Sequence, residues 1–282
     1  MRKDLMKVHK HPLAHGIALK KQYGQHFLRE QSFIDQMIAA VDLSTHSSVF
    51  EIGCGDGFLT RSILQQSIER LWIFEIDPAW AAYVRTTYSD KRMIILEENI
   101  LEADFSSMEP YAPWTLLANI PYQITFPLLH LLQEHRNLLK EGVIMIQEEA
   151  AQKLVKTHGR GYGFSSLFFQ HFFELKLLAK IPPSAFYPPP KVHSRLLYFK
   201  PRSVLDEIPD EKEFWRFVKH LFNQPRRILK NVLQSFHYDL AKVAEETLAL
   251  RAQQLNKEQI IALWMCVNHE GSVSEDCFKQ KD

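Results

Sequence analysis

Apolar residues in the first 200 positions form short blocks that alternate with longer stretches of helical spacing. Five blocks are typical of buried strands, at 49–52, 71–76, 93–96, 115–118 and 143–146. The stretches between them predict helices that end near residue 66, begin at Asp77-Pro78, and span about 124–139. This alternation predicts an α/β fold with a largely parallel, doubly wound sheet, Rossmann-like in its order.

The pattern changes towards the C-terminus. Further strands are expected at 175–181 and 196–199, on either side of a proline-rich segment. From about residue 206 the apolar positions follow only helical spacing. We therefore expect a basic N-terminal arm at 1–20, an α/β domain at 21–205 and a small all-helical domain at 206–282.

The composition is that of a globular chain with a sizeable core, since 46% of the 282 residues are hydrophobic and only 10 are glycine. No apolar run approaches the ~20 residues that span a bilayer. The three cysteines are far apart, which favours a reducing compartment and argues against a metal cluster. His9, His11 and His15 lack a Cys or carboxylate cluster beside them, so we expect no metal. A cytoplasmic protein is expected.

Charge is distributed unevenly along the chain. The net charge is +1 overall, but residues 1–30 carry +5, residues 31–149 carry −10 and residues 150–205 carry +8. A protein that binds a polyanion concentrates its cations, and a nearly acid-free stretch of this length fits that class better than an ordinary solvated surface does.

A glycine-rich turn, Gly53-Cys54-Gly55-Asp56-Gly57, follows the first strand and opens a helix. Glycines in this context allow a sharp turn and close approach to a nucleotide-bearing ligand. Glu75, eighteen residues beyond Gly57, ends the second strand, where a carboxylate can accept hydrogen bonds from both ribose hydroxyls. Asn99 follows the third strand and is placed to meet an adenine, although an Asn in a strand-to-loop turn is also common.

The tetrapeptide Asn119-Ile120-Pro121-Tyr122 follows the fourth strand, at the edge where open α/β sheets bind ligands. The Asn119 side chain and the Pro121 carbonyl can accept the hydrogens of an exocyclic amine, and Tyr122 can stack on the base. The pattern GxGxG, rather than GxGxxG, and this tetrapeptide favour a methyltransferase over a dehydrogenase.

These segments together resemble the KsgA/Dim family of small-subunit ribosomal RNA adenine N6-dimethyltransferases, over about residues 20–270. The matching pieces are Tyr23 to Leu28, Glu51 to Gly57, Phe74 to Asp77, Asn119 to Tyr122, Gln147 to Glu149, Gly161 to Gly163, Pro182 to Phe186, Pro188 to Val192, and Phe222 to Lys230.

The resemblance implies S-adenosylmethionine as cofactor. Its methionine part would lie against His26, Leu28 and Gly53, with Gly55 in the same turn, its ribose on Glu75 and its adenine on Asn99. Asn119 would contact the cofactor and also meet the reacting amine. His26 stands where the family has Asn, Asn99 where it has Asp, and Phe164 where small or varied residues are commoner.

The resemblance also implies that an extruded adenine stacks between Tyr122 and Phe186, with the catalytic set being Asn119, Pro121, Tyr122 and Phe186. The substrate would be small-subunit rRNA or a pre-30S particle, with no membrane and a monomeric enzyme. The candidate phosphate contacts are Lys153, Lys156, Arg160, Lys191, Arg195, Arg226, Arg227 and Lys230, with the arm residues Arg2, Lys3, Lys7, Lys10, Lys20 and Lys21.

Three other functions fit parts of the pattern. An Erm-type enzyme that methylates large-subunit rRNA would share the cofactor turn and the tetrapeptide, but the 182–192 and 222–230 segments favour the small-subunit enzyme. A non-catalytic RNA-binding assembly factor would be favoured by loss of Asn119, Tyr122 or Glu75, and all three are present. Protein-amide methylation usually uses Asn-Pro-Pro-Tyr, so Ile120 argues against it.

Overall fold

The computed structural model describes residues 13–20 and 23–268. Its internal contacts divide the chain into two units: residues 1–151 with 176–201, and residues 152–175 with 202–282. Most of the predicted basic arm, including Arg2, Lys3, Lys7, Lys10 and Lys21, lies outside the described residues. None of the helices in the described part of the chain is long and apolar enough to cross a membrane.

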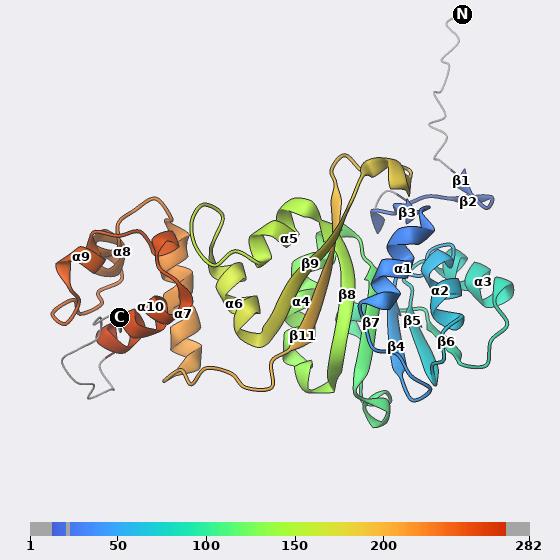
Figure 1. The fold of residues 1–282 in the computed structure, drawn as a ribbon, viewed down its shortest axis with the longest axis horizontal. Helices are drawn as coiled ribbons and strands as arrows, with labels where there is room; N and C mark the ends of the chain where they lie inside the picture. Colours follow the sequence, from blue (N-terminus) through green and yellow to red (C-terminus); the bar gives the residue numbers. More distant parts are fainter. Residues whose placement is uncertain (1–12, 21–22, 269–282) are drawn as a thin grey trace, which may run out of the picture. The chain divides into compact units, whose positions relative to one another are not determined.

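A seven-stranded sheet forms the centre of the first unit (Figure 1), with the order β6-β5-β4-β7-β8-β11-β9. The strands are β4 (Ser48–Ile52), β5 (Arg70–Phe74), β6 (Met93–Leu96), β7 (Trp114–Asn119), β8 (Leu139–Gln147), β9 (Phe173–Ile181) and β11 (Ser194–Pro201). The first five strands of that order pair in parallel, and β11 pairs antiparallel to β8. The predicted, largely parallel sheet is confirmed.

Alternation along the strands divides the core between the two faces of the sheet. On one face, Val49 and Leu71 pack in a cluster that includes residues from α1 (Gln31–Ala39), α2 (Phe58–Leu64) and α3 (Pro78–Thr87). On the other face, the ring of Phe50 stacks on Trp114 at a centroid distance of 4.3 Å. A small apolar cavity there is also lined by Leu131 and Leu132 of α4 (Thr125–Glu134). Helices cover both faces, so the central strands are buried on both sides and are mostly apolar, with Glu51 of β4 as a buried exception.

The register brings the ends of three strands to one edge. Ile52 pairs with Phe74 of β5 and with Ala118 of β7, so the residues that follow these strands emerge together. Glu75 continues the ladder by donating its backbone N–H to the carbonyl of Leu96 at 3.0 Å. The glycine-rich turn, Glu75 and Asn119 are therefore neighbours because of strand order, which is the general arrangement of ligand sites in open α/β sheets.

Several short elements were not predicted. A hairpin of β1 (Leu13–Ala14) and β2 (Ile17–Ala18) precedes the sheet. A second ladder joins β3 (Phe27–Leu28) to β10 (Phe186–Tyr187). This pairing connects two segments about 160 residues apart in sequence, and neither strand is long enough to give a periodic signal.

The second unit is helical. It contains α6 (Phe164–Phe172), α7 (Glu211–Asn223), α8 (Leu229–Ser235), α9 (Glu245–Leu248) and α10 (Lys257–Val267), while α5 (Glu148–Leu154) crosses the boundary between the units. Trp215 of α7 packs edge-on against Phe168 of α6 at 4.9 Å between ring centroids. The boundaries at 20 and 205 stay predictions, and the structure adds that residues 152–175 group with the C-terminal helices.

Gly142→Ala should lower the free energy of unfolding by about 1–3 kcal/mol, because overpacking a tight core costs that much. A Cβ at Gly142 of β8 would lie 2.6 Å from the carbonyl oxygen of Leu116 and 2.5 Å from the Phe199 ring. The carbonyl belongs to the neighbouring strand and cannot move without disturbing the ladder. Urea unfolding measures the loss.

Gly163→Ala is the matched control for this substitution. Its Cβ would come no closer than 3.9 Å to Phe222, and Gly163 has an extended φ of −173° that any residue adopts. We expect its free energy of unfolding to stay within about 0.5 kcal/mol of the wild type. An equal loss in both variants would contradict the argument from Gly142.

Candidate active site

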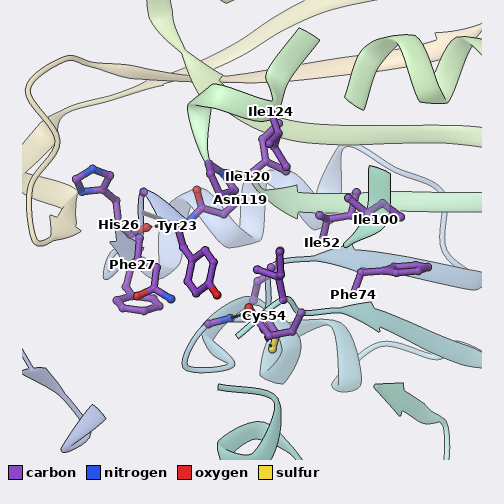
Figure 2. Close-up of a pocket in the computed structure, with 18 of the residues that line it drawn as sticks. Tyr23, His26, Phe27, Ile52, Cys54, Phe74, Ile100, Asn119, Ile120 and Ile124 are labelled. Carbon is purple, nitrogen blue, oxygen red and sulfur yellow. Dashed lines mark hydrogen bonds between the residues drawn. The ribbon is translucent and has the colours of Figure 1, made fainter. Parts of the chain in front are cut away.

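A cavity of about 360 Å³ opens at the carboxyl edge of the sheet (Figure 2). Its walls come from the segment 23–28, the glycine-rich turn, the end of β5, the loop after β6 and the tetrapeptide that begins at the last residue of β7. The predicted site residues that line it are His26, Leu28, Gly53, Gly55, Glu75, Asn99, Asn119, Pro121 and Tyr122. Strand order and turn chemistry thus bring together nine of the ten residues predicted for the cofactor and for catalysis.

The glycine-rich turn forms a cradle that side chains would fill. Gly55 has a φ of +51°, a conformation that favours glycine, and a Cβ there would overlap the ring of Phe27. Phe27 is itself 7% exposed and packs edge-on against Trp80 at 5.0 Å between centroids. Because Phe27 is fixed, there is no room for a side chain at position 55. The glycine there leaves its backbone open to a ligand in the cavity.

Glu75 is 5% exposed and is hydrogen-bonded to the glycine-rich turn. Its Oε2 accepts the backbone N–H of Gly55 at 3.1 Å, and its Oε1 accepts the N–H of Asp77 at 2.9 Å. Burial raises the pKa of the Glu75 carboxyl, and the two N–H donors oppose that effect by stabilising the charged form. Oε2 also accepts the thiol of Cys54 at 3.6 Å, so the lone pair left for a hydroxyl donor of a ligand is on Oε1.

Asn99 lines the cavity but also has a local structural role. Its Oδ1 accepts the N–H of Leu101 at 3.2 Å, which caps the 3₁₀ turn Ile100–Glu102, and its Nδ2 donates to Glu102 at 3.0 Å. The amide oxygen therefore has one lone pair left that could accept a hydrogen bond from an adenine. That contact stays a prediction.

Asn119 is oriented by the segment on the other side of the cavity. Its Nδ2 donates to the backbone carbonyl of His26 at 3.0 Å. Within the described residues its Oδ1 accepts no hydrogen bond, so this acceptor is available to a donor in the cavity. The carbonyl of Pro121 accepts the N–H of Ile124 at 3.1 Å, which leaves it one lone pair.

Tyr122 is held from two sides. Its hydroxyl and that of Ser194 are 2.6 Å apart, and the His26 ring stacks on its ring at 6.2 Å with an interplanar angle of 22°. Burial raises the pKa of the Tyr122 phenol, and the hydrogen bond to Ser194 partly offsets this. The ring therefore stays neutral and fixed in orientation.

The imidazole of His26 points away from the other labelled residues in Figure 2. Its Nδ1 lies 2.7 Å from the carbonyl oxygen of Pro188, which can only accept, so Nδ1 carries the proton. The family resemblance predicted that His26 contacts the methionine part of the cofactor. Its backbone borders the cavity, whereas its ring braces Tyr122 and the 182–192 segment.

Phe186 is the predicted site residue that the cavity does not include. It is 4% exposed, belongs to the main apolar cluster and pairs with Leu28 across the β10–β3 ladder. The next residue, Tyr187, is 43% exposed. The proline-rich segment buries the first aromatic side chain and exposes the second, a choice that strand pairing decides and composition does not reveal.

The predicted phosphate contacts separate into two groups. Arg195 of β11 forms a two-pronged ion pair with Glu148 at 2.6 and 2.7 Å and also donates to the carbonyl of Leu178. Three of its five donors are engaged inside the first unit, and its role as a phosphate contact stays a prediction. Lys191 is exposed in the same unit. The remaining candidates, in the second unit, are Lys153, Lys156, Arg160, Arg226, Arg227 and Lys230.

Some residues of the site gave no separate signal in the sequence. Asp56, in the glycine-rich turn, forms ion pairs with Arg29 and, at 3.4 Å, with His15 of the N-terminal hairpin. Lys20, predicted as part of the basic arm, pairs with the buried Asp77 at 2.7 Å. These pairs connect the segment before residue 30 to the cofactor turn and to the start of α3, and no signal in the sequence indicated which residues would pair.

Glu51 of β4 is fully buried beneath the turn. Its Oε2 accepts the hydroxyl of Thr60 at 2.7 Å, while its Oε1 has no partner among the described residues. Burial raises the pKa of the Glu51 carboxyl to about 8. The folded protein therefore keeps this proton at neutral pH.

Glu51→Gln should flatten the pH dependence of stability between about pH 5 and 8. An unfolded chain releases the Glu51 proton near pH 4.3, and the folded chain holds it to about pH 8. The folded state binds more protons in this window, so the free energy of unfolding falls as the pH rises. Urea unfolding at several pH values measures the slope, and parallel profiles for the two proteins would contradict the burial of this carboxyl.

Two kinds of comparison place the chain among known proteins. The sequence profile of the family described as ribosomal RNA adenine dimethylase matches residues 16–267. Ribosomal RNA small subunit methyltransferase A of Syntrophotalea carbinolica is 36% identical over 76% of this chain and 81% of its own length. The protein of the same name from Chlorobium luteolum is 34% identical over 89% of this chain and 90% of its own.

The solved structures agree on the fold. A dimethyladenosine transferase from Plasmodium falciparum superposes with a TM-score of 0.71 at 20% identity, covering 84% of this chain and 96% of its own. The 23S rRNA methyltransferase ErmE gives 0.70 at 23% identity, covering 86% and 100%. At these identities the solved structures show the fold alone. The profile and the sequence relatives confirm the resemblance, and the chain belongs to the ribosomal RNA adenine dimethylase family.

Proposed function

We propose that this chain transfers methyl groups from S-adenosylmethionine to N6 of two adjacent adenines near the 3′ end of small-subunit rRNA, dimethylating each. The observation that carries the proposal is the orientation of Asn119, whose Nδ2 is held by the His26 carbonyl so that Oδ1 is available to an amine. The sequence relatives named small subunit methyltransferase A support the small subunit as substrate. Similarity to ErmE concerns the fold and does not favour the large subunit.

The cavity fits the cofactor on the chain's own geometry. Gly55 presents bare backbone, Glu75 keeps a free lone pair on Oε1, and Leu28 supplies an apolar wall. In this proposal Glu75 holds the ribose hydroxyls, Asn99 faces the adenine, and Gly53 with the backbone around His26 borders the methionine part. When bound, S-adenosylmethionine supplies an electrophilic methyl group on a cationic sulfur.

The protein's part in the reaction is orientation. Asn119 Oδ1 and the remaining lone pair of the Pro121 carbonyl would accept the two hydrogens of the adenine amine, which favours a pyramidal nitrogen whose lone pair faces the methyl group. Fixed acceptors of this kind act without reorganising during the reaction. The proton leaves to solvent, so no strong base is needed.

The base would stack on Tyr122, whose ring is already fixed by Ser194 and His26. Such stacking is worth ~1–3 kcal/mol per base. Phe186 would serve as the second face only after leaving its buried position in the core, while Tyr187 is exposed beside it. The remaining cations of the predicted set would contact phosphates, and we propose a monomeric, cytoplasmic enzyme.

Asn119→Ala should lower the rate of methyl transfer by about 10²–10³-fold, the usual cost of removing one preorganised polar group from a reaction centre. The assay uses labelled S-adenosylmethionine with undermethylated small subunits and identifies the labelled nucleoside. Large subunits run in parallel. N6,N6-dimethyladenosine on small subunits, lost in the variant, is the expected result.

The control for Asn119→Ala is the Kd of S-adenosylhomocysteine measured by calorimetry, which should rise far less than the rate of transfer falls. Label on large subunits alone would replace the proposal with the Erm-type activity. Cofactor binding without any transfer by the wild type would instead support the assembly factor.

His26→Ala should slow methyl transfer about tenfold while leaving S-adenosylhomocysteine affinity nearly unchanged. The ring braces Tyr122 and Pro188, and only the His26 backbone carbonyl, which the variant retains, orients Asn119. Measuring the rate constant for transfer and the cofactor Kd separates these roles. A Kd that rises as far as the rate falls would instead assign the ring to the cofactor.

A further inference from the structure

Four carboxyl groups lie in and around the glycine-rich turn, and three of them have cationic or backbone donors. Asp56 forms an ion pair with Arg29, and Asp77 forms one with Lys20 at 2.7 Å. Glu75 accepts two backbone N–H groups. These donors compensate the three groups for the water that each loses on burial.

The fourth carboxyl group, that of Glu51, has no such compensation. It is fully buried in β4, and Thr60 of α2 is its one hydrogen-bond partner among the described residues, through its hydroxyl at 2.7 Å and its backbone N–H. The Oε1 of Glu51 accepts no hydrogen bond in this part of the chain. A buried oxygen without a donor suits an uncharged carboxyl group, and burial raises the pKa of Glu51 to about 8. At pH 7 the group therefore holds its proton.

Glu51 lies directly behind the wall of the cofactor cavity. The two residues that follow it in the chain, Ile52 and Gly53, both line the cavity. Burial is the main cause of the raised pKa of Glu51, and the negative charges of Glu75 and Asp56, which also line the cavity, add to it. A charge in the cavity thus acts on this carboxyl group, and a positive charge acts in the opposite direction to these two.

The other titratable groups around Glu51 supply no positive charge. Burial raises the pKa of the Cys54 thiol in the turn and of the Tyr88 phenol after α3, so both groups are neutral at pH 7. Arg61 of α2 has an exposed side chain that donates to Gln31 at 3.1 Å. In the described part of the chain no cation pairs with Glu51, so a positive charge can reach it only from a ligand.

We propose that Glu51 senses the charge on the sulfur of the ligand: it releases its proton to solvent when cationic S-adenosylmethionine binds, and it takes a proton back from solvent when methyl transfer leaves the neutral sulfur of S-adenosylhomocysteine. The two ligands differ by one methyl group and one charge. A carboxylate behind the turn attracts a sulfonium but gains nothing from a thioether. Glu51 would therefore make the cavity prefer the cofactor to the product. The inference rests on the proposed function for the identity of this pair of ligands.

The first test counts protons. Isothermal titration calorimetry of the full chain, in buffers that differ in ionisation enthalpy, gives the number of protons released on binding. A fall of about 1 in the pKa of Glu51, the lower end of the effect of an opposite charge, releases about 0.4 of a proton at pH 7. S-adenosylmethionine should release about this amount from the wild type, and S-adenosylhomocysteine should release none. Glu51→Gln should remove the release.

Affinity is the second test, because proton release and ligand affinity are linked. At pH 8 the Kd of S-adenosylmethionine should be about fivefold higher for Glu51→Gln than for the wild type, since the variant cannot form the carboxylate. At pH 6 both proteins keep an uncharged side chain at this position, and the two Kd values should agree within about twofold. The Kd of S-adenosylhomocysteine should agree at both pH values.

Glu141→Gln is the matched control. Glu141 of β8 is also a buried glutamate of the sheet, 7% exposed, but it does not line the cavity. Its two oxygens accept the N–H of Asp42 and the hydroxyl of Tyr198, each at 2.8 Å. This variant should release as many protons as the wild type and keep both affinities. Glutamine matches the uncharged carboxyl group in size, so Glu51→Gln should also fold, which its urea unfolding curve checks.

The comparison of the two ligands on the wild type tests the proposal without any variant. Equal proton release with both ligands, or an unchanged release in Glu51→Gln, would overturn it; the second result would assign the proton to another group, such as Glu75. Methyl transfer to small subunits without proton release on cofactor binding would refute the role of Glu51 and leave the proposed function intact. The expected proton counts without any methyl transfer would support that role and refute the proposed function.

Discussion

The hydrogen bond from the Asn119 side chain to the His26 carbonyl is the constraint on which the site depends. It joins the end of β7 to a segment about 90 residues earlier, and it decides which end of the amide faces the cavity. The imidazole ring of His26 also hydrogen-bonds the Pro188 carbonyl and stacks on Tyr122. Three distant segments therefore share one anchor, and the acceptor geometry for a base amine follows from it.

Buried carboxylates surround the turn at some cost to stability. Glu51 is fully buried, Glu75 is 5% exposed, and burial raises the pKa of both carboxyl groups. A cationic ligand in the cavity would stabilise their charged forms, since an opposite charge lowers the pKa of a carboxyl group. This arrangement is better suited to a cationic cofactor than to an anionic one, and it is typical of functional sites, where stability is given up for binding.

The sequence predicted those parts of the structure that follow from periodicity and turn chemistry. Buried parallel strands are largely continuous apolar runs, so β4 to β8 were visible, and strand order then placed Glu75 and Asn119 on either side of β4 at one cavity. Long-range pairing was not visible. The two-residue β3–β10 ladder buries Phe186, and Glu148 engages Arg195 across 47 positions. These pairings leave no local pattern in the sequence, so neither the burial of Phe186 nor the ion pair of Arg195 could be identified beforehand.

The charge distribution explains why a second binding surface is needed. Residues 31–149, which supply most of the cavity walls, carry a net charge of −10, and a polyanion is repelled by such a segment beyond the immediate contacts. In the proposed function, attraction for RNA comes from the basic stretch that follows, residues 150–205, which carries a net charge of +8. An acidic catalytic edge suits a cationic cofactor, and a basic stretch of chain suits the RNA that delivers the base. Because the acidic and the basic residues lie in different stretches of the chain, each stretch can suit its own ligand without weakening the other.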